Sequence, residues 1–366
     1  MDKRETDKAA SIQPDTQSSA RRRFLGGAAG IAGVAATMGW PEVFAADDLG
    51  LPANLVAAAR KEGMLVPYEP FPTAQSQPLA DGFTKEFGIP NKFFRAGQEA
   101  LQTRLEAEIR GGRVLADTIG QGDFDVVLDM IDRGVVDVES RPAVWDQYPE
   151  QWRIPKFNNI PFATLSCNMI YNKDLVKAAD APRSWKDLVA PQWKGKVVIP
   201  SPEYAGTGFA LLADWVRRYG WDFIKALKAN ETFIAQAVSD SDNRVISGQK
   251  LVGIANSHRG STLIGQGAPI VFLWPTETPA IVLSYVHAIL KKAPNPNAAK
   301  LYRDYCLTEK VQSSQAKFGL WSVHPKAMQP ANLPALSEVP LQRLDWDHIR
   351  KERTKLLDGW RNIIRG

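Results

Sequence analysis

From residue 50 onward, short apolar stretches alternate with stretches in which apolar residues recur every three or four positions. The runs Met64–Pro70 and Gly195–Pro200 are typical of short strands, whereas the spacing of Leu79, Phe83 and Phe87 is typical of the buried face of a helix. Strands and helices that alternate in this way form sheets with helices on both faces. The pattern therefore predicts the α/β fold class.

The chain is long enough to exceed one ordinary hydrophobic core. It has 366 residues, of which 44% are hydrophobic, and we therefore expect two domains. The stretch 161–172 (PFATLSCNMIYN) is mostly apolar and longer than an ordinary strand. We interpret it as a strand that runs from one domain into the other.

The first 45 residues are typical of an export signal. Arg21-Arg22-Arg23-Phe24-Leu25 resembles the twin-arginine motif, and a weakly apolar segment rich in Gly and Ala follows it. The alternative is a membrane anchor, but this segment is too short and too rich in glycine to span a bilayer well. The sequence thus predicts a twin-arginine signal peptide over residues 1–45, with cleavage before Ala46, and a location in the bacterial periplasm.

The charge and the cysteines exclude several classes of protein. The net charge is +5, but no block of basic residues stands out after the signal, so a nucleic-acid partner is not expected. The only cysteines are Cys167 and Cys306, which lie in apolar surroundings without metal-binding spacing. Two buried free thiols are favoured over a disulfide.

Familiar catalytic and cofactor motifs are absent from the sequence. There is no phosphate-binding loop, no dinucleotide-binding glycine pattern, no nucleophile elbow and no zinc-protease motif. The four histidines are far apart along the chain. We therefore expect no enzyme, no cofactor and no resident metal.

Polar residues gather where the predicted strands lead into helices. In open α/β sheets, ligands bind beyond the carboxyl ends of the strands, next to the free N–H groups of the following helices. The stretch Ser201–Leu211 (SPEYAGTGFAL) is one such junction, and its small residues let a ligand approach the backbone. The alternative is that the polar side chains at such junctions only cap helices. Capping would suffice to explain Thr207 here and Ser241 in a later junction.

The junction Asn256–Thr262 (NSHRGST) adds a charged group. Arg259 follows His258 directly after an apolar strand, and a guanidinium matches a carboxylate or phosphate in two places. This arrangement predicts a site for an anion, although a surface arginine beside a helix cap would look the same.

The chain resembles a known family, the periplasmic solute-binding proteins of ABC importers in the family 1 or ferric-iron-binding-like group. The resemblance covers roughly residues 55–335 and rests above all on PRSWKDLVAPQWKGKVVIPSPEYAGTGFALLA, with support from FRAGQEALQTRLEAEIRGGRVLADTI and GAPIVFLWPTETP. It implies the type II periplasmic binding protein fold, in which hinge strands join two Rossmann-like lobes that close on a ligand. It also implies a small-molecule ligand, an ABC membrane permease as partner, and a monomer.

With this resemblance, the expected boundaries of the lobes can be given. Residues 50–165 and 272–335 form lobe 1, and residues 166–271 form lobe 2. Residues 336–366 form a C-terminal helical segment that packs on the lobes.

The sequence departs from the iron-binding members of that group at one junction. Those proteins carry adjacent tyrosines where this chain has Asn256-Ser257-His258-Arg259. An arginine is unfavourable beside a trivalent cation, so a small organic anion such as a carboxylate, phosphonate or phosphorylated compound is favoured. Uptake of ferric iron or a metal chelate stays open as the alternative, and an enzyme on the same scaffold is a third hypothesis.

The junctions together yield a set of candidate ligand-binding residues. Tyr204 and the aromatic residues are expected to pack on the ligand, the amides and hydroxyls to bind anionic oxygens, and the acidic residues to bind an amine on the same molecule. The candidates are Tyr68, Thr73, Gln98, Asp123, Tyr204, Gly206, Thr207, Gly208, Asp240, His258, Arg259, Trp274 and Glu277.

Overall fold

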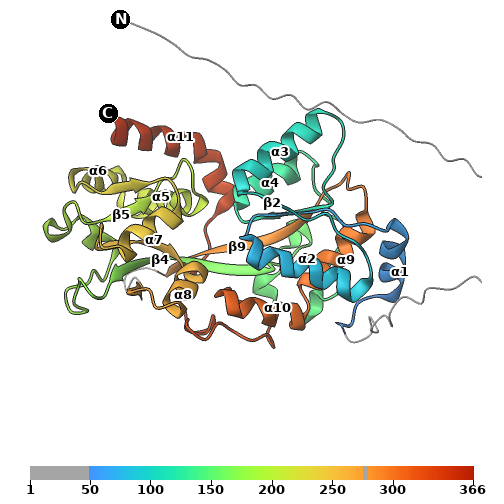
Figure 1. Ribbon diagram of the computed structural model, residues 1–366. Helices are drawn as coiled ribbons and strands as arrows, with labels where there is room; N and C mark the ends of the chain where they lie inside the picture. Colours follow the sequence, from blue (N-terminus) through green and yellow to red (C-terminus); the bar gives the residue numbers. More distant parts are fainter. Residues whose placement is uncertain (1–48, 275–278) are drawn as a thin grey trace, which may run out of the picture. The chain divides into compact units, whose positions relative to one another are not determined.

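The computed structural model of the protein describes residues 49–274 and 279–366 (Figure 1). The predicted signal peptide and Glu277 lie outside the described residues. The helices are α1 (Ala53–Glu62), α2 (Thr73–Phe87), α3 (Gln98–Arg110), α4 (Phe124–Asp132), α5 (Gly206–Tyr219), α6 (Trp221–Ala229), α7 (Val238–Ile246), α8 (Ser257–Gly265), α9 (Pro296–Cys306), α10 (Glu309–Gln315) and α11 (Trp346–Arg365). The strands are β1 (Pro67–Glu69), β2 (Phe94–Arg95), β3 (Thr118–Gln121), β4 (Ala163–Asn172), β5 (Val198–Pro200), β6 (Phe233–Ala235), β7 (Val252–Asn256), β8 (Ile270–Leu273), β9 (Ala280–Ile289) and β10 (Leu341–Gln342).

Most of the strands form one mixed sheet, in the order β2-β1-β3-β9-β4-β7, with β10 beside β9 and β8 beside β4. β1 pairs in parallel with β2 and β3, whereas β9 runs antiparallel to both β3 and β4. β5 and β6 form a separate parallel pair, and a bridge from Val197 to Val252 connects this pair to β7. The alternation of strands and helices predicted from the sequence is confirmed.

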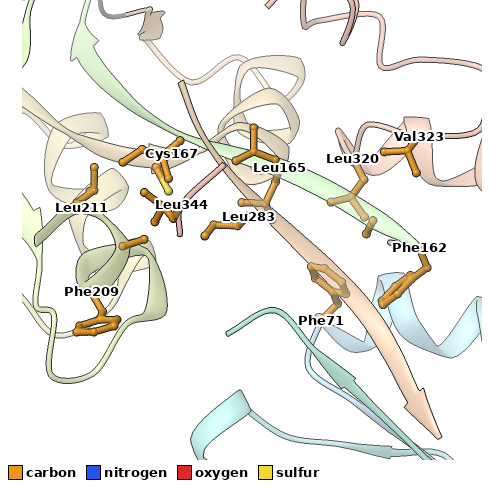
Figure 2. Packing of buried hydrophobic residues seen from close by; sticks show 14 of the residues in the cluster. Phe71, Phe162, Leu165, Cys167, Phe209, Leu211, Leu283, Leu320, Val323 and Leu344 are labelled. Atoms are coloured by element: carbon orange, nitrogen blue, oxygen red, sulfur yellow. The ribbon is translucent and has the colours of Figure 1, made fainter. Parts of the chain in front are cut away.

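The two longest strands, β4 and β9, connect the strands β1, β2 and β3 with the strands β7 and β8. Ala163–Cys167 of β4 pair with Tyr285–Ile281 of β9, and Cys167–Tyr171 continue into pairs with β7. All ten residues of β4 are buried. Figure 2 shows the register partners Leu165 and Leu283 packed together in the apolar cluster between these strands and the helices. The stretch 161–172 thus contains a strand that pairs first with β9 and then with β7. That it runs from one domain into the other stays a prediction.

Two helix starts follow the local sequence to different lengths. The S-x-x-D spacing of Ser184 and Asp187 indicates a helix start. Each of the two residues accepts the other's backbone N–H, but only a five-residue 3-10 helix follows, Trp185–Val189. The C-terminal segment expected to be helical contains α11, and Asp345 caps it by accepting the N–H of His348.

Both cysteines are free and buried, as the sequence favoured. Burial raises the pKa of the Cys167 thiol to about 12, so this thiol is inert at neutral pH. The expected division into two lobes and a C-terminal segment, at residues 165, 271 and 335, stays a prediction.

A buried carboxylate on α5 yields a test of the fold. Asp214 is 1% exposed, and it accepts hydrogen bonds from Arg217 (2.8 Å), Arg218 (2.8 Å) and the Gln342 amide of β10 (2.9 Å). Asp214→Ala should lower the free energy of unfolding by about 3 kcal/mol, because it removes the acceptor from a buried network. Urea unfolding followed by circular dichroism measures this loss.

Asp222→Ala is the matched control for this prediction. Asp222 pairs with Lys225 at 2.9 Å, but its side chain is 91% exposed, so the loss should stay below about 1 kcal/mol. Equal losses in the two variants would contradict the structural role of Asp214.

Candidate functional site

Several polar ends of secondary-structure elements meet around one pocket of about 290 Å³. Its lining residues follow β1 and β7, lie on β9, or begin α3, α4, α5 and α7. They are Pro70, Phe71, Gln98, Glu99, Asp123, Ala205, Gly206, Thr207, Ala237, Val238, Ser239, Asn256, Leu283 and Tyr285. The pocket therefore lies where an α/β fold usually binds its ligand.

A larger hollow of about 670 Å³ lies elsewhere, between Leu175 and Lys196 and beside Leu251. It is more open to solvent and is lined mainly by the loop and short 3-10 helices that follow β4. No helix of eight residues or more begins at it among the described residues. We take the smaller pocket as the candidate site, because the N-termini of four helices and the ends of β1 and β7 converge there.

The helices that begin at the pocket have free N-terminal amides. The residues that precede α3, α4, α5 and α7 are Gly97, Asp123, Ala205 and Ala237, and none of their side chains caps its helix. The first N–H groups of a helix carry a partial positive charge when they are not capped. The pocket thus has a positive backbone surface without a cationic side chain.

The start of α5 explains the glycines of SPEYAGTG. A Cβ on Gly208 would lie 2.6 Å from the carbonyl oxygens of Pro200 and Ser201, so only glycine lets the helix pack this closely on the end of β5. A Cβ on Gly206 would overlap with the carboxylate of Asp123 from α4. Gly208 shapes the site from behind, and Gly206 brings two walls of the pocket into contact.

Thr207 connects two walls of the pocket and caps no helix. Its buried hydroxyl donates a hydrogen bond of 2.9 Å to Oδ1 of Asn256, at the end of β7. Ser241 was the other residue that helix capping could explain. Its hydroxyl accepts the N–H of Ile254 at 3.0 Å and so connects α7 with β7.

Asp123 has the most perturbed carboxyl group at the pocket. Burial raises its pKa to about 7, the charge of Asp125 adds to the rise, and the charge of Arg353 opposes it. Its carboxylate accepts no hydrogen bond from the residues that the structure describes. Asp123 is therefore partly protonated at neutral pH, and it is free to accept a donor or to give one.

Gln98 and Tyr285 form the opposite side of the pocket. The Gln98 amide lies against the side-chain carbonyl of Gln121 and within 3.1 Å of the Tyr285 hydroxyl. The Tyr285 ring packs on Phe71, with 4.6 Å between the ring centres. Burial raises the pKa of Tyr285, so its hydroxyl stays protonated and can donate.

Tyr68 was predicted to contact the ligand, but the structure places it in the core beneath the pocket. It is 1% exposed, its hydroxyl donates to Glu108 at 2.5 Å, and it accepts from Arg104 at 2.7 Å. Burial, with a further contribution from the hydrogen bond to Glu108, raises the pKa of Tyr68 to about 12. Its hydrogen-bonding groups are already used within the protein.

Arg259 and His258 are also engaged outside the pocket. The Arg259 guanidinium donates at 2.7 Å to Asp242, whose side chain is fully buried in α7. His258 packs edge-on against Phe71, and burial, with the nearby Arg259 charge, lowers its pKa to about 4. The structure therefore uses the guanidinium to neutralise a buried acid, and neither side chain lines the pocket.

The remaining candidates lie apart from the pocket lining. Thr73 is exposed at the start of α2, and Tyr204 is 55% exposed before α5. Asp240 pairs with Arg244 along α7 at 2.9 Å. Trp274 packs near the ring of Trp321, with 6.1 Å between the centres.

Sequence reasoning thus selected four lining residues, Gln98, Asp123, Gly206 and Thr207, and missed others. Asn256 lay in a predicted junction, but its role was not singled out. Tyr285 lies in the stretch 280–290 (AIVLSYVHAIL), whose mostly apolar residues indicate a strand but do not single out Tyr285.

The side chains at the pocket carry negative charge. None of its described lining residues is Lys, Arg or His, and two of them, Glu99 and Asp123, are acidic. Within the described residues there is also no group of three or more His, Cys, Asp or Glu side chains that could hold a metal ion. The pocket combines positive helix ends with acceptor side chains.

The sequence pattern of one protein family, described as bacterial extracellular solute-binding protein, matches residues 121–352. The chain belongs to this family. A curated relative, a putative 2-aminoethylphosphonate-binding periplasmic protein of Salmonella typhimurium, is 21% identical over 301 residues, which cover 77% of this chain and 86% of the relative. The solute-binding protein is thus similar to periplasmic proteins over most of its length.

Solved structures of solute-binding proteins share its fold. The periplasmic binding protein AfuA of Actinobacillus pleuropneumoniae, solved with fructose-6-phosphate, aligns with a TM-score of 0.72 and 23% identity over 83% of this chain and 99% of AfuA. Iron-bound HitA of Pseudomonas aeruginosa aligns with a TM-score of 0.73 and 19% identity, over 82% of this chain and 99% of HitA. The type II periplasmic binding protein fold expected from the sequence is confirmed.

The protein is the periplasmic binding component of an ABC transporter, in the ferric-iron-binding-like group. Its relatives include a probable ABC transporter periplasmic-binding protein of Sinorhizobium fredii, which is 27% identical over 75% of this chain and 78% of the relative. Among the described helices, none combines the length and the apolar character needed to cross a bilayer.

The raised pKa of Asp123 has a consequence for stability. The folded state keeps a proton on this carboxyl up to about pH 7, whereas the unfolded chain loses it near pH 4. The contribution of Asp123 to the free energy of unfolding must therefore fall as the pH rises from 4 to 7. Asp123→Asn should unfold like the parent at pH 4, and it should be more stable above pH 7 by at most about 4 kcal/mol.

Urea unfolding at a series of pH values between 4 and 8 checks this prediction. Asp146→Asn is the control, because the Asp146 side chain is 91% exposed and its removal should leave the pH profile unchanged. A stability difference between Asp123→Asn and the parent that does not change with pH would contradict the shifted pKa.

Proposed function

We propose that the protein captures a small organic anion that also carries a hydrogen-bond donor, in the pocket between α3, α4, α5 and α7. The observation that carries the proposal is that four uncapped helix N-termini meet at a pocket whose charged side chains are acidic. Free backbone N–H groups bind anionic oxygens, whereas an ionised carboxylate only accepts hydrogen bonds. A ligand that satisfies both must present an anionic group and a donor.

The size of the pocket limits the ligand further. Its volume of about 290 Å³ is at the low end of ligand pockets, which typically range from about 300 to 1,000 Å³. An aminoalkyl phosphonate or a small phosphorylated compound has the expected charge and size. The names of two similar proteins, one for 2-aminoethylphosphonate and one solved with fructose-6-phosphate, agree with this class.

Within this proposal the residues have separate roles. The amides at Gly206–Gly208 and at Val238–Ser239 bind the anionic group, and the hydrogen bond from Thr207 to Asn256 holds this part of the pocket in place. Asp123 and Glu99 accept the donor, while Gln98 and Tyr285 orient the ligand. Closure about β4 and β9 brings the walls together and buries it.

Ferric iron is the alternative ligand, since HitA is described as iron-bound. The pocket would have to offer it Glu99, Asp123 and Tyr285, which is a set of anionic oxygen donors. Burial raises the pKa of Tyr285, however, and so disfavours the phenolate that ferric iron requires. We therefore rank iron second.

A thermal-shift screen tests the ligand class. The probes are 2-aminoethylphosphonate, fructose-6-phosphate, ferric citrate and ethylphosphonate, which has the same anionic group as the first but no ammonium. We expect stabilisation by an organic anion with a donor, about 2.7 kcal/mol at a hundredfold excess over Kd. Ethylphosphonate should bind less tightly than its amino counterpart. Stabilisation by ferric citrate alone would favour the iron alternative.

Two variants locate the site with the best probe of the screen. Thr207→Val should weaken binding by about 1 kcal/mol, the usual value of one hydrogen bond. Arg259→Ala should leave the affinity unchanged but lower the stability by about 3 kcal/mol, since it isolates the buried Asp242. Loss of binding in Arg259→Ala without loss of stability would contradict this location and would indicate that the ligand binds at α8.

We further propose export by the twin-arginine route. In cells that produce the full chain, Arg21→Lys with Arg22→Lys should leave most of the protein unprocessed in the cytoplasm, because that route reads the guanidinium pair. Fractionation followed by immunoblotting measures the distribution. Lys8→Gln is the control outside the motif, and unimpaired export of the double variant would contradict the proposed route.

A further inference from the structure

The C-terminal helix α11 is bound to one wall of the pocket by apolar contacts. Its buried residues Leu356 and Trp360 belong to the same apolar cluster as Phe209 of α5 and Phe223 of α6. A Cβ on Gly359 would overlap with the indole ring of Trp221, so the helix lies directly on α6. By contrast, the buried residues Val127 and Met130 of α4 belong to a separate cluster.

With the other wall, α11 makes polar contacts. Arg350 pairs with Asp132 at the end of α4 at 2.5 Å, and Arg353 pairs with Asp125 at its beginning. The Asp125 side chain is 3% exposed, and its second oxygen has no partner within the described residues. Arg353 is therefore the group that compensates a buried carboxylate on α4.

Arg353 also contacts the opposite wall. Its guanidinium lies over the ring of Phe209 in α5, at 4.2 Å from the ring centre. Asp125 is two residues beyond Asp123, and Phe209 is three residues beyond Gly206, and both of those earlier residues line the pocket. One side chain from outside the pocket thus connects the two helices whose ends meet across it. Figure 1 shows α11 running from α5 and α6 toward α4.

We propose that α11 is a clasp that is fixed to the α5–α6 wall and holds the α4 wall through Arg350 and Arg353. The exposed pair of Lys156 and Asp347, at 3.1 Å, adds a contact on the same side. If the walls move apart, the apolar contacts keep α11 on α6 and the ion pairs with α4 must break. These pairs therefore favour the closed pocket and raise the affinity at a site that they do not touch. The inference rests on the hinge closure in the proposed function, but not on the chemical class of ligand.

The test measures the separation of the walls without any ligand. Spin labels are attached through Ala100→Cys on α3 and Ala229→Cys on α6, both exposed, while the buried Cys167 and Cys306 stay unlabelled. Pulsed electron resonance then reports the distribution of distances. In Arg350→Gln with Arg353→Gln, the ratio of long to short distances should rise about fivefold for each pair lost.

Lys351→Gln with Lys355→Gln is the matched control. It removes two positive charges from exposed positions of the same helix, and Lys355 pairs with Glu352 within α11, so it should leave the distances unchanged. If the loss of Arg353, the partner of Asp125, impairs folding, the single variant Arg350→Gln still breaks one pair with α4. Exchanging the charges of that pair, by Arg350→Asp with Asp132→Arg, should restore the parental distances. An unchanged distribution in the folded arginine variants, or an equal shift in the lysine control, would overturn the clasp.

Discussion

The antiparallel pairing of β4 with β9 is the constraint on which the site depends. Each of these strands pairs with its partner through part of its length and with a different group of strands elsewhere, β3 for β9 and β7 with β8 for β4. Their register therefore decides which strand ends face each other. Tyr285 and Leu283 of β9 lie in the pocket because this pairing holds them between the end of β3 and the end of β7. Local sequence determines the individual junctions, but β4 and β9 bring them together.

The parts that sequence could predict are those with a local cause. Strand ends followed by helix starts are visible as polar residues after apolar runs, and Gln98, Asp123, Gly206 and Thr207 were found in this way. Tyr285 was not, because a strand buried on both faces has no alternation that would mark one side chain as facing a cavity. The short 3-10 helix after Ser184 shows the opposite limit, since a correct capping signal says where a helix begins but not how long it lasts.

Arg259 shows why a local reading of charge is insufficient. The guanidinium has the right neighbours for an anion site, but the anion that it meets is Asp242 of the same chain, fully buried and 2.7 Å away. A buried carboxylate without a partner would cost several kcal/mol, so the intramolecular pair takes precedence over a ligand. Asp242 lies only a short distance earlier in the sequence, but on a different helix, and its burial follows from packing that no short pattern reveals.

With Arg259 engaged, the electrostatics of the pocket depend on the backbone. Four helix ends supply positive potential, and they cost nothing in side-chain ordering when a ligand arrives. Asp123 lies against the first residue of α5, where an anionic ligand would also bind. A carboxyl whose pKa is about 7 can stay neutral beside such an anion or ionise beside an ammonium. In the proposed function, the same residue can therefore meet an ammonium as a carboxylate or stay protonated beside the anionic group.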